Sequence, residues 1–352
     1  MLRRLDLAQP YFHSNSVSVM NFLASVSRTL LSQAKLGIAI LLTSATVAQA
    51  QDFPSRPITV IVPFSAGGPT DKVARDIAQI MGKQLQKPLI IENAAGAGGT
   101  IGTKKVVLAK NDGYTVLIHH IGMATAPSLY RHLGFDPLKD LEMVGEIADV
   151  PMVLLGAKAF PPASANELPA YLKANASNIS LANAGIGSAS HLCGLLLQSA
   201  LQTELTTVPY KGTAPALSDL MGGQVNLMCD QTTNVSGQIK SGAVKPYAAM
   251  QTQRIQAFKD IPTAQEGGLP PIEVKIWHAM YAPKGTPAAI IDKLSAALQA
   301  AVQEPGFKSK MADLGAQAVT PARAQPASLR THLGHEIDKW TPIIKKAGIY
   351  AD

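Results

Sequence analysis

The stretch of sequence that decides the fold is PITVIVPFSAGGPTDKVARDIAQIM, residues 57–81. It opens with an apolar, β-branched run at 57–64, which is short enough to be a strand buried on both faces. Gly67 and Gly68 then break the run, and the apolar residues that follow recur at helical spacing on one stripe: Val73, Ile77, Ile80 and Met81. Strand, glycine-rich loop and helix in this order are typical of an α/β protein with a parallel sheet.

The same alternation continues along the chain. Further strands are predicted at 88–91 and 114–119 with a helix at 104–110 between them, which completes a βαβαβ unit with right-handed crossovers. A second unit of this kind begins after residue 162. Its predicted helices are 167–173, 190–201 and 214–221, and its predicted strands are 179–182, 207–208, 225–228 and 244–250.

Two extended apolar segments, at 147–157 and 272–282, lie between these units. We predict that they pair as crossover strands, so that the middle of the chain forms a second lobe inserted into the first. Two C-terminal helices are predicted, at 287–302 and along an apolar stripe of Leu329, Leu333, Ile337, Trp340 and Ile344. No strands accompany them, which favours their packing on the sheet of the first lobe. The predicted fold is therefore two-lobed α/β, with residues 51–155 and 274–352 in lobe 1 and residues 156–273 in lobe 2.

The first fifty residues have the pattern of a secretory signal. Lys35 precedes an apolar run at 36–47, which is followed by Ala48-Gln49-Ala50, a small-residue cleavage site. The run is much shorter than the roughly 20 residues that a membrane-spanning helix needs. We therefore predict that residues 1–50 are a signal peptide cleaved after Ala50 and that the remaining chain is periplasmic; whether translation begins at Met1 or Met20 stays open.

The net charge of +7 does not indicate nucleic-acid binding. The predicted signal holds four of the 31 basic residues and one of the 24 acidic residues, so its removal leaves a net charge of +4. Aromatic residues make up only 5% of the chain, and a nucleic-acid surface needs clustered basic residues with aromatic side chains for stacking. Nucleic acid is therefore not an expected partner.

The chain has two cysteines, Cys193 and Cys229. In an exported protein they could form one disulfide, and the spacing does not decide the pairing. Each lies in an apolar run, HLCGLLLQSAL or VNLMC, which favours two small buried hydrophobic side chains. A catalytic thiol is not expected, because neither cysteine has a histidine and asparagine arrangement around it.

Loops that lead from a strand into a helix are where such sheets bind ligands, because helix N-termini offer free N–H groups and partial positive charge. Four loops have this character, at 64–71, 93–102, 185–191 and 208–213, although the first could be a structural turn alone and the second is favoured as a tight strand-to-helix turn. Asp71 and Asp230 could brace these loops, and Lys211 could be solvated. The candidate ligand-binding residues are Phe64, Ser65, Ala66, Gly67, Gly68, Thr70, Asp71, His120, Gly187, Ser188, His191, Lys211, Gly212 and Asp230.

Other chemistry is not supported by the motifs. The glycine loop at 93–102 fails the dinucleotide fingerprint, because a pattern that starts at Gly96 requires glycine where Ile101 stands. Ser188 lies in GIGSAS and lacks the second glycine of a nucleophile elbow. His119 and His120 are adjacent on a predicted strand, so we expect them to point to opposite faces and not to share a metal ion. No catalytic residue, metal ligand or cofactor is predicted.

Together the loops resemble those of the Bug-type extracytoplasmic solute receptors, which serve tripartite tricarboxylate transporters. The similar segments run in order over the mature chain: PFSAGGPTDKVAR (63–75), ENAAGAGGTIG (92–102), GIGSASHL (185–192), VPYKGTAPALSDLMGGQVNLMCD (208–230) and WHAMYAPKGTPAAIIDKL (277–294). The resemblance implies a periplasmic-binding-protein fold, type II-like, with two crossover strands between the lobes. It also implies that the loops at 64–71 and 185–191 grip one ligand carboxylate through backbone groups and ordered water. Ala126, His119-His120 and Cys229 depart from the family pattern and bear on the specificity pocket.

The expected function is that of a periplasmic receptor for a small organic anion: a di- or tricarboxylate, an amino-acid-like acid or an aromatic acid. The resemblance implies that it works as a monomer and delivers the ligand to the integral membrane subunits of a tripartite transporter. One alternative is an exported transferase or hydrolase on the same scaffold, which would need a nucleophile with an adjacent base. Another is a ligand-sensing partner of a membrane signalling protein.

Overall fold

The computed structural model of the chain describes residues 53–348, 350 and 351. The predicted signal peptide and its cleavage site lie outside the described residues. From Pro54 onward the chain forms one compact unit. Within the described part, no helix is both long enough and apolar enough to cross a membrane.

The first half of the sheet is parallel, as predicted. Strand β1 (Ile58–Val62) lies between β2 (Leu89–Asn93) and β3 (Thr115–His120) and pairs with both in parallel. The connecting helices are α2 (Pro69–Leu85) and α3 (Thr100–Val107). Helix α2 begins where a proline, which needs no N–H partner, occupies the first helical position. The βαβαβ prediction is therefore confirmed.

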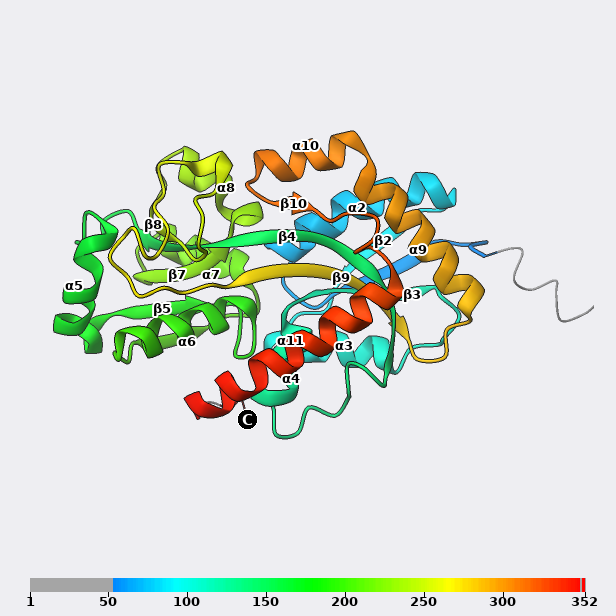
Figure 1. The fold of residues 1–352 in the computed structure, drawn as a ribbon, viewed down its shortest axis with the longest axis horizontal. Helices are drawn as coiled ribbons and strands as arrows, with labels where there is room; N and C mark the ends of the chain where they lie inside the picture. Colours follow the sequence, from blue (N-terminus) through cyan, green and yellow to red (C-terminus); the bar gives the residue numbers. More distant parts are fainter. Residues whose placement is uncertain (1–52, 349, 352) are drawn as a thin grey trace, which may run out of the picture. The chain divides into compact units, whose positions relative to one another are not determined.

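Two long strands carry the chain between the two halves of the sheet (Figure 1). Strand β4 (Leu141–Ala157) and strand β9 (Lys275–Pro283) are antiparallel partners from Leu141 opposite Pro283 to Pro151 opposite Lys275, with register shifts at 143–145 and 146–148. The predicted pairing of the crossover segments is therefore confirmed, although β4 begins six residues earlier than the segment at 147–157. Strand β9 also pairs with β3, which places the crossovers beside the first parallel unit.

The second half of the sheet is built on the end of β4. That end pairs with β7 (Leu227–Gln231) and with β8 (Val244–Ala249), both antiparallel. Strand β5 (Ser180–Asn183) lies parallel to β7 and to β6 (Thr206–Pro209). The strand order is β2-β1-β3-β9-β4-β7-β5-β6, and the two-residue strand β10 (Gln317–Ala318) pairs with β4. The lobe boundaries at 155 and 273 stay a prediction.

Five more helices confirm the pattern and three were not predicted. The predicted ones are α5 (Leu168–Asn175), α6 (Ala189–Leu201), α7 (Thr213–Met221), α9 (Ala288–Gln303) and α11 (Pro326–Ala347). The others are α4 (Gly122–Leu129), α8 (Thr232–Lys240) and α10 (Pro305–Asp313). These three are short, α4 contains a proline and α8 is mostly polar, so none shows a clear apolar stripe.

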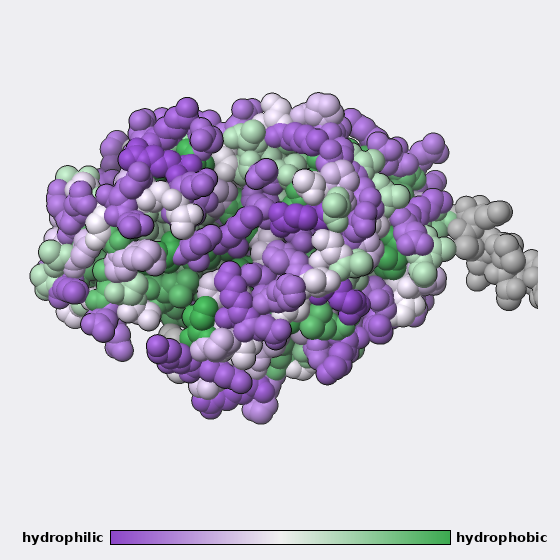
Figure 2. All heavy atoms as spheres, in the orientation of Figure 1, coloured by the Kyte–Doolittle hydropathy of each residue, from purple (hydrophilic) through white to green (hydrophobic). Residues whose placement is uncertain are grey.

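The C-terminal helix α11 packs on α4 and β4 with the buried face that the sequence predicts. Of its predicted stripe, Ile337 is partly buried and the other residues are fully buried. Figure 2 shows that hydrophilic residues cover most of the opposite, outward side in this view. Short 3-10 helices complete the described chain at Ala97–Gly99, Ala165–Glu167, Ala176–Asn178 and Gln256–Phe258.

Candidate functional site

The loops that the sequence selects meet where the two halves of the sheet face each other. The backbone N–H of Ser65, after β1, donates to the carbonyl of Lys211, after β6, at 3.2 Å. The hydroxyl of Tyr130 donates to the carbonyl of Ile186 at 2.7 Å. The first bond joins the loops at 64–71 and 208–213, and residues of all three predicted loops, among them Thr70, Ser190 and Thr213, line one cavity.

A narrow cavity lies between these loops. Its accessible volume is about 10 Å³, which is the room of about one water molecule. A larger solute can therefore enter only if the two halves of the sheet move apart. The lining residues are Phe64, Pro69, Thr70, His120, Met152, Ala184, Ala189, Ser190, Thr213, Asp230 and Gln231.

Four of the predicted ligand-binding residues line this cavity: Phe64, Thr70, His120 and Asp230. The other predicted residues belong to the same three loops or to the adjacent helix starts without lining it. Sequence reasoning missed several lining residues. Five adjoin predicted ones, namely Pro69, Ala189, Ser190, Thr213 and Gln231, and the position of Thr213 at the start of a helix was a usable signal. Met152, on the crossover strand β4, had no sequence signal.

Asp71 braces the first loop. Its carboxylate accepts from the Gly67 N–H at 2.9 Å, from Arg75 Nε at 2.9 Å and from Asn93 Nδ2 at 3.0 Å. Burial opposes ionisation, but these hydrogen bonds keep the pKa of Asp71 below its ordinary value. Asp71 therefore connects the turn at Gly67 to Arg75 on α2 and to Asn93 at the end of β2, and its oxygens are engaged by these donors.

The second loop is held by side chains at the start of α6. Ser188 Oγ caps the helix by accepting from the His191 N–H at 3.3 Å, and Ser190 Oγ accepts from the Ala184 N–H at 2.7 Å. The Gly187 N–H donates to His191 Nδ1 at 3.2 Å. Burial lowers the pKa of His191 to about 4, so this imidazole is neutral near pH 7 and serves as an acceptor in the loop.

Three buried histidines, His119, His120 and His278, lie together on the side of the cavity where Phe64 lies. His120 stacks on the Phe64 ring at 4.6 Å between centroids, and His278 Nε2 lies 3.3 Å from Thr70 Oγ1. Burial lowers the pKa of His119 and of His278 to about 3 and lowers that of His120 well below 6.5, so all three are neutral. Within the described residues no cluster of histidine, cysteine or carboxylate side chains could hold a metal ion.

The expected orientation of His119 and His120 was wrong. Their ring centroids are only 4.8 Å apart, in an edge-to-face arrangement, and both rings contact Phe64. Both residues lie in β3 and pair with β9, but the His119 ring folds back along the chain, where its Nδ1 accepts from the His120 N–H at 2.7 Å, so the two rings meet.

Asp230 is the penultimate residue of β7, lines the cavity and is 1% exposed. Its Oδ1 accepts from the Gln231 N–H at 2.7 Å, and its Oδ2 accepts from Asn234 Nδ2 at 2.5 Å. Burial raises the pKa of Asp230 to about 7, although these hydrogen bonds and the Lys72 ammonium oppose the shift. Asp230 therefore faces the ligand space while it also braces the start of α8.

Lys211 contributes its backbone to the loop contact. Its side chain is exposed and lines a different cavity, beside Tyr130, Tyr210 and Ile186. Gly212 is buried against Ser65: a Cβ added to Gly212 would lie 2.1 Å from Ser65 Oγ. The close approach of the two loops therefore depends on glycine at this position.

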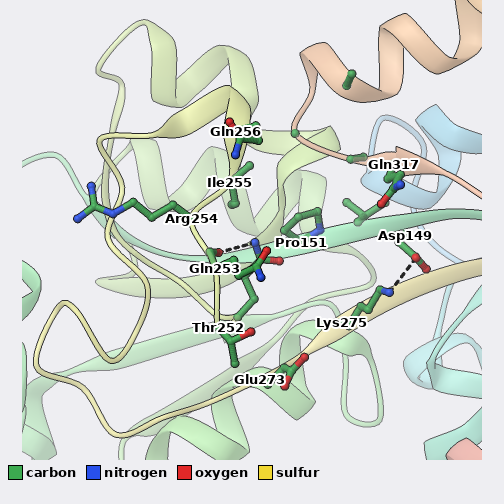
Figure 3. A pocket seen from close by; sticks show the side chains of 15 residues that line it. Asp149, Pro151, Thr252, Gln253, Arg254, Ile255, Gln256, Glu273, Lys275 and Gln317 are labelled. Carbon is green, nitrogen blue, oxygen red and sulfur yellow. Dashed lines mark hydrogen bonds and ion pairs between the residues drawn. The ribbon is translucent and has the colours of Figure 1, made fainter.

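A larger cavity lies along the crossover strands (Figure 3). It has a volume of about 490 Å³ and is lined by β4, β9, the segment 251–256 and the turn after α10. None of the predicted ligand-binding residues lines it. The Asp149 carboxylate and the Lys275 ammonium form an ion pair there at 2.9 Å, so these charges neutralise each other.

The favoured prediction for the cysteines was wrong. Cys193 and Cys229 are both fully buried, as expected, but they form a disulfide. Sequence could not establish this pairing, because it depends on the packing of α6 against β7, whose cysteines are 36 residues apart.

The fold and the cleft define a two-lobed solute receptor. Residues 73–349 match the family described as "Tripartite tricarboxylate transporter family receptor", so the chain belongs to this family. This confirms the resemblance to Bug-type receptors. A protein of Agrobacterium vitis, described as "UPF0065 protein in the TAR-I ttuE-ttuC' intergenic region", is 46% identical over 88% of this chain and 91% of its own length.

Two solved structures are also similar. The periplasmic binding protein BugD is 49% identical, with a TM-score of 0.83, over 85% of this chain and 99% of that protein. MatC from Rhodopseudomonas palustris, solved with bound malate, is 40% identical, with a TM-score of 0.80, over 83% of this chain and 100% of that protein. Both support the two-lobed fold and the role of solute receptor.

Proposed function

We propose that this chain is a periplasmic receptor that captures a small carboxylate between its lobes and delivers it to the membrane subunits of a tripartite transporter. The observation that carries this proposal is the convergence of two helix starts on one cavity. Thr70 in the first turn of α2 and Ser190 in the first turn of α6 line it from opposite sides.

The first-turn N–H groups of a helix have no acceptor within that helix, and the helix dipole favours negative charge there. Helices α2 and α6 are 17 and 13 residues long, so both present a full N-terminal turn. The residues that line the cavity include no lysine or arginine. A carboxylate in the cleft would therefore be held by backbone N–H groups and by hydroxyl and imidazole groups.

The predicted site residues outside the cavity lining would act through the loops. The first loop would be shaped by Ser65, Ala66, Gly67, Gly68 and Asp71. The second loop would be shaped by Gly187, Ser188 and His191. Lys211 and Gly212 would hold the contact between lobes. The malate bound to the similar MatC protein fits a small dicarboxylate as the ligand class.

The test is a binding panel on the purified mature protein. We expect succinate, malate, aspartate, citrate, adipate or benzoate to raise the melting temperature, because a ligand at 100 times its Kd stabilises the folded state by about 2.7 kcal/mol. The control is the diamide of the best ligand, which keeps the shape but removes the charge and should give no shift. The proposal is wrong if no acid produces a shift, or if the diamide binds equally well.

Export and delivery need separate measurements. Intact mass of the protein from the periplasmic fraction should correspond to a chain that begins at Gln51. Cells that carry the receptor together with tripartite membrane subunits should accumulate the radiolabelled ligand, and removal of the receptor should abolish uptake. Uptake that persists without the receptor would contradict the delivery step.

A further inference from the structure

A hydrogen-bonded chain of three side chains links the two halves of the sheet at the cavity. Lys72, in the first turn of α2, donates from Nζ to Asn234 Oδ1 at 3.0 Å and to the Asn234 carbonyl at 3.1 Å. Asn234, in the first turn of α8, donates from Nδ2 to Asp230 Oδ2 at 2.5 Å. Helix α2 follows β1 and α8 follows β7, so this chain exists only when the two halves are together.

The network fixes the orientation of the Asn234 amide. Its oxygen faces an ammonium group, which can only donate, and its nitrogen faces a carboxylate, which accepts when it is ionised. Asn234 is 3% exposed and Asp230 is 1% exposed, so water does not replace these partners readily. The Lys72 ammonium thus favours the ionised form of Asp230, against the effect of burial.

Asp230 keeps acceptor capacity towards the cavity. Each carboxylate oxygen has two lone pairs, and one protein N–H is bound at each oxygen. Among the residues that line the cavity, the other titratable side chain is the neutral His120. Above about pH 7, the raised pKa of Asp230, the side of the cavity at this residue therefore offers an anionic acceptor, while the N-termini of α2 and α6 suit an anion.

We propose that Lys72 is a positioning residue that, through Asn234, sets Asp230 as a hydrogen-bond acceptor in the closed cleft, so that the receptor selects carboxylates that also carry a hydroxyl or amino donor. This inference rests on the proposed function and narrows its substrate class. An unsubstituted dicarboxylate would offer no donor to the remaining acceptor positions of the buried Asp230, and a buried acceptor that loses water without gaining a new hydrogen bond opposes binding.

The experiment compares three ligands that differ only at carbon 2: succinate with hydrogen, L-malate with a hydroxyl and L-aspartate with an ammonium group. We expect the wild-type protein to bind malate or aspartate at least about tenfold more tightly than succinate in titration calorimetry, which corresponds to about 1.4 kcal/mol. Failure of all three ligands, and of the rest of the panel, would instead overturn the proposed function.

The variants separate positioning from a structural effect. Lys72→Met removes the donor and should reduce the preference for malate or aspartate over succinate to within about threefold. Lys72→Arg keeps a charged donor and should retain part of this preference. Asp230→Asn should also abolish the preference. Lys83→Met removes the same charge from an exposed position on the same helix and should leave the ratio unchanged.

The ratio of the two dissociation constants is the decisive measurement, because a general disturbance of the cleft would weaken succinate and malate equally. Equal wild-type affinity for succinate and for the better of malate and aspartate would overturn the inference. A Lys72→Met protein that loses affinity for all three ligands equally, with an unchanged ratio of the dissociation constants for succinate and for malate or aspartate, would also overturn it. Thermal melts identify any variant that has failed to fold. If Asp230→Asn is unstable, the Lys72 variants still test the inference.

Discussion

Cys193 on α6 and Cys229 on β7 are joined by a disulfide directly beneath the ligand loops. Cys193 lies two residues after His191, and Cys229 immediately precedes Asp230. The bond therefore ties the helix whose N-terminus faces the cavity to the strand that carries the buried carboxylate. Both elements belong to the same half of the sheet, so the bond leaves the relative motion of the two halves free.

The disulfide should contribute strongly to stability. It closes a segment of 36 residues, and the chain-entropy model assigns about 4 kcal/mol to a loop of this size. We expect the double variant Cys193→Ala/Cys229→Ala to unfold at a clearly lower urea concentration than the wild type. Dithiothreitol should lower the midpoint of the wild type and leave that of the variant unchanged. Equal midpoints for the two oxidised proteins would contradict this expectation.

Gly212→Ala should weaken ligand binding without a large loss of stability. The added Cβ would lie 2.1 Å from Ser65 Oγ and 2.9 Å from the Ser65 backbone nitrogen, so the two loops could not approach as closely. We expect the Kd for the best ligand to rise at least about tenfold, which is about 1.4 kcal/mol. Gly237→Ala is the matched control, because nothing lies within 4 Å of its added Cβ. An unchanged Kd for Gly212→Ala would show that this contact is not needed for capture.

Arg323 should be essential to the stability of the crossover strands. Its guanidinium donates to both oxygens of Asp149, at 2.6 and 3.0 Å, and also contacts the carboxylate of Glu146, which is 1% exposed. Arg323→Met removes this partner from two buried carboxylates, but Asp149 keeps Lys275 and Glu146 keeps His332, so we expect a loss below the about 3–5 kcal/mol of a fully unpaired buried charge. Urea unfolding should detect this loss. Adding Asp149→Asn to Arg323→Met should recover part of the loss, and a purely additive double variant would argue against the pairing.

Acid should destabilise the protein through its buried histidines. The pKa is about 3 for His119 and His278 and about 4 for His191 in the folded chain, against an ordinary value of 6.5. The unfolded chain therefore binds more protons between about pH 6.5 and pH 4, and the free energy of unfolding falls as the pH falls through this window. Asp230, with its pKa raised to about 7, acts in the opposite direction over the same range.

The histidine effect should dominate because several imidazoles oppose one carboxyl. We expect the melting temperature to decrease steadily from pH 7.5 to pH 4.5, and the decrease to be smaller in His119→Gln, which lacks one of the buried imidazoles. A melting temperature that stays constant or rises on acidification would contradict the assignment of neutral, buried histidines.

Much of the architecture could be predicted from local patterns. Each pattern that predicted an element is contained in a single strand or helix. These patterns are the β-branched run at 57–64, the apolar stripe after Gly68 and the two apolar segments at 147–157 and 272–282. Helices α4, α8 and α10 escaped prediction because they are short and lack a clear apolar stripe. Part of the cavity lining was predicted, because Thr70 and Asp230 lie near strand or helix ends.

The sequence by itself determined most of the strands and the longer helices, the two crossovers and the glycine-rich loops that could bind an anion. These features depend on hydrophobic periodicity and on residues with special backbone freedom, which act over short distances along the chain. Only the tertiary structure decided that Cys193 bonds to Cys229, that Met152 lines the cavity and that Lys72 contacts Asn234. These contacts join residues on separate elements, and their distances follow from how the sheet and its helices pack, which no local pattern encodes.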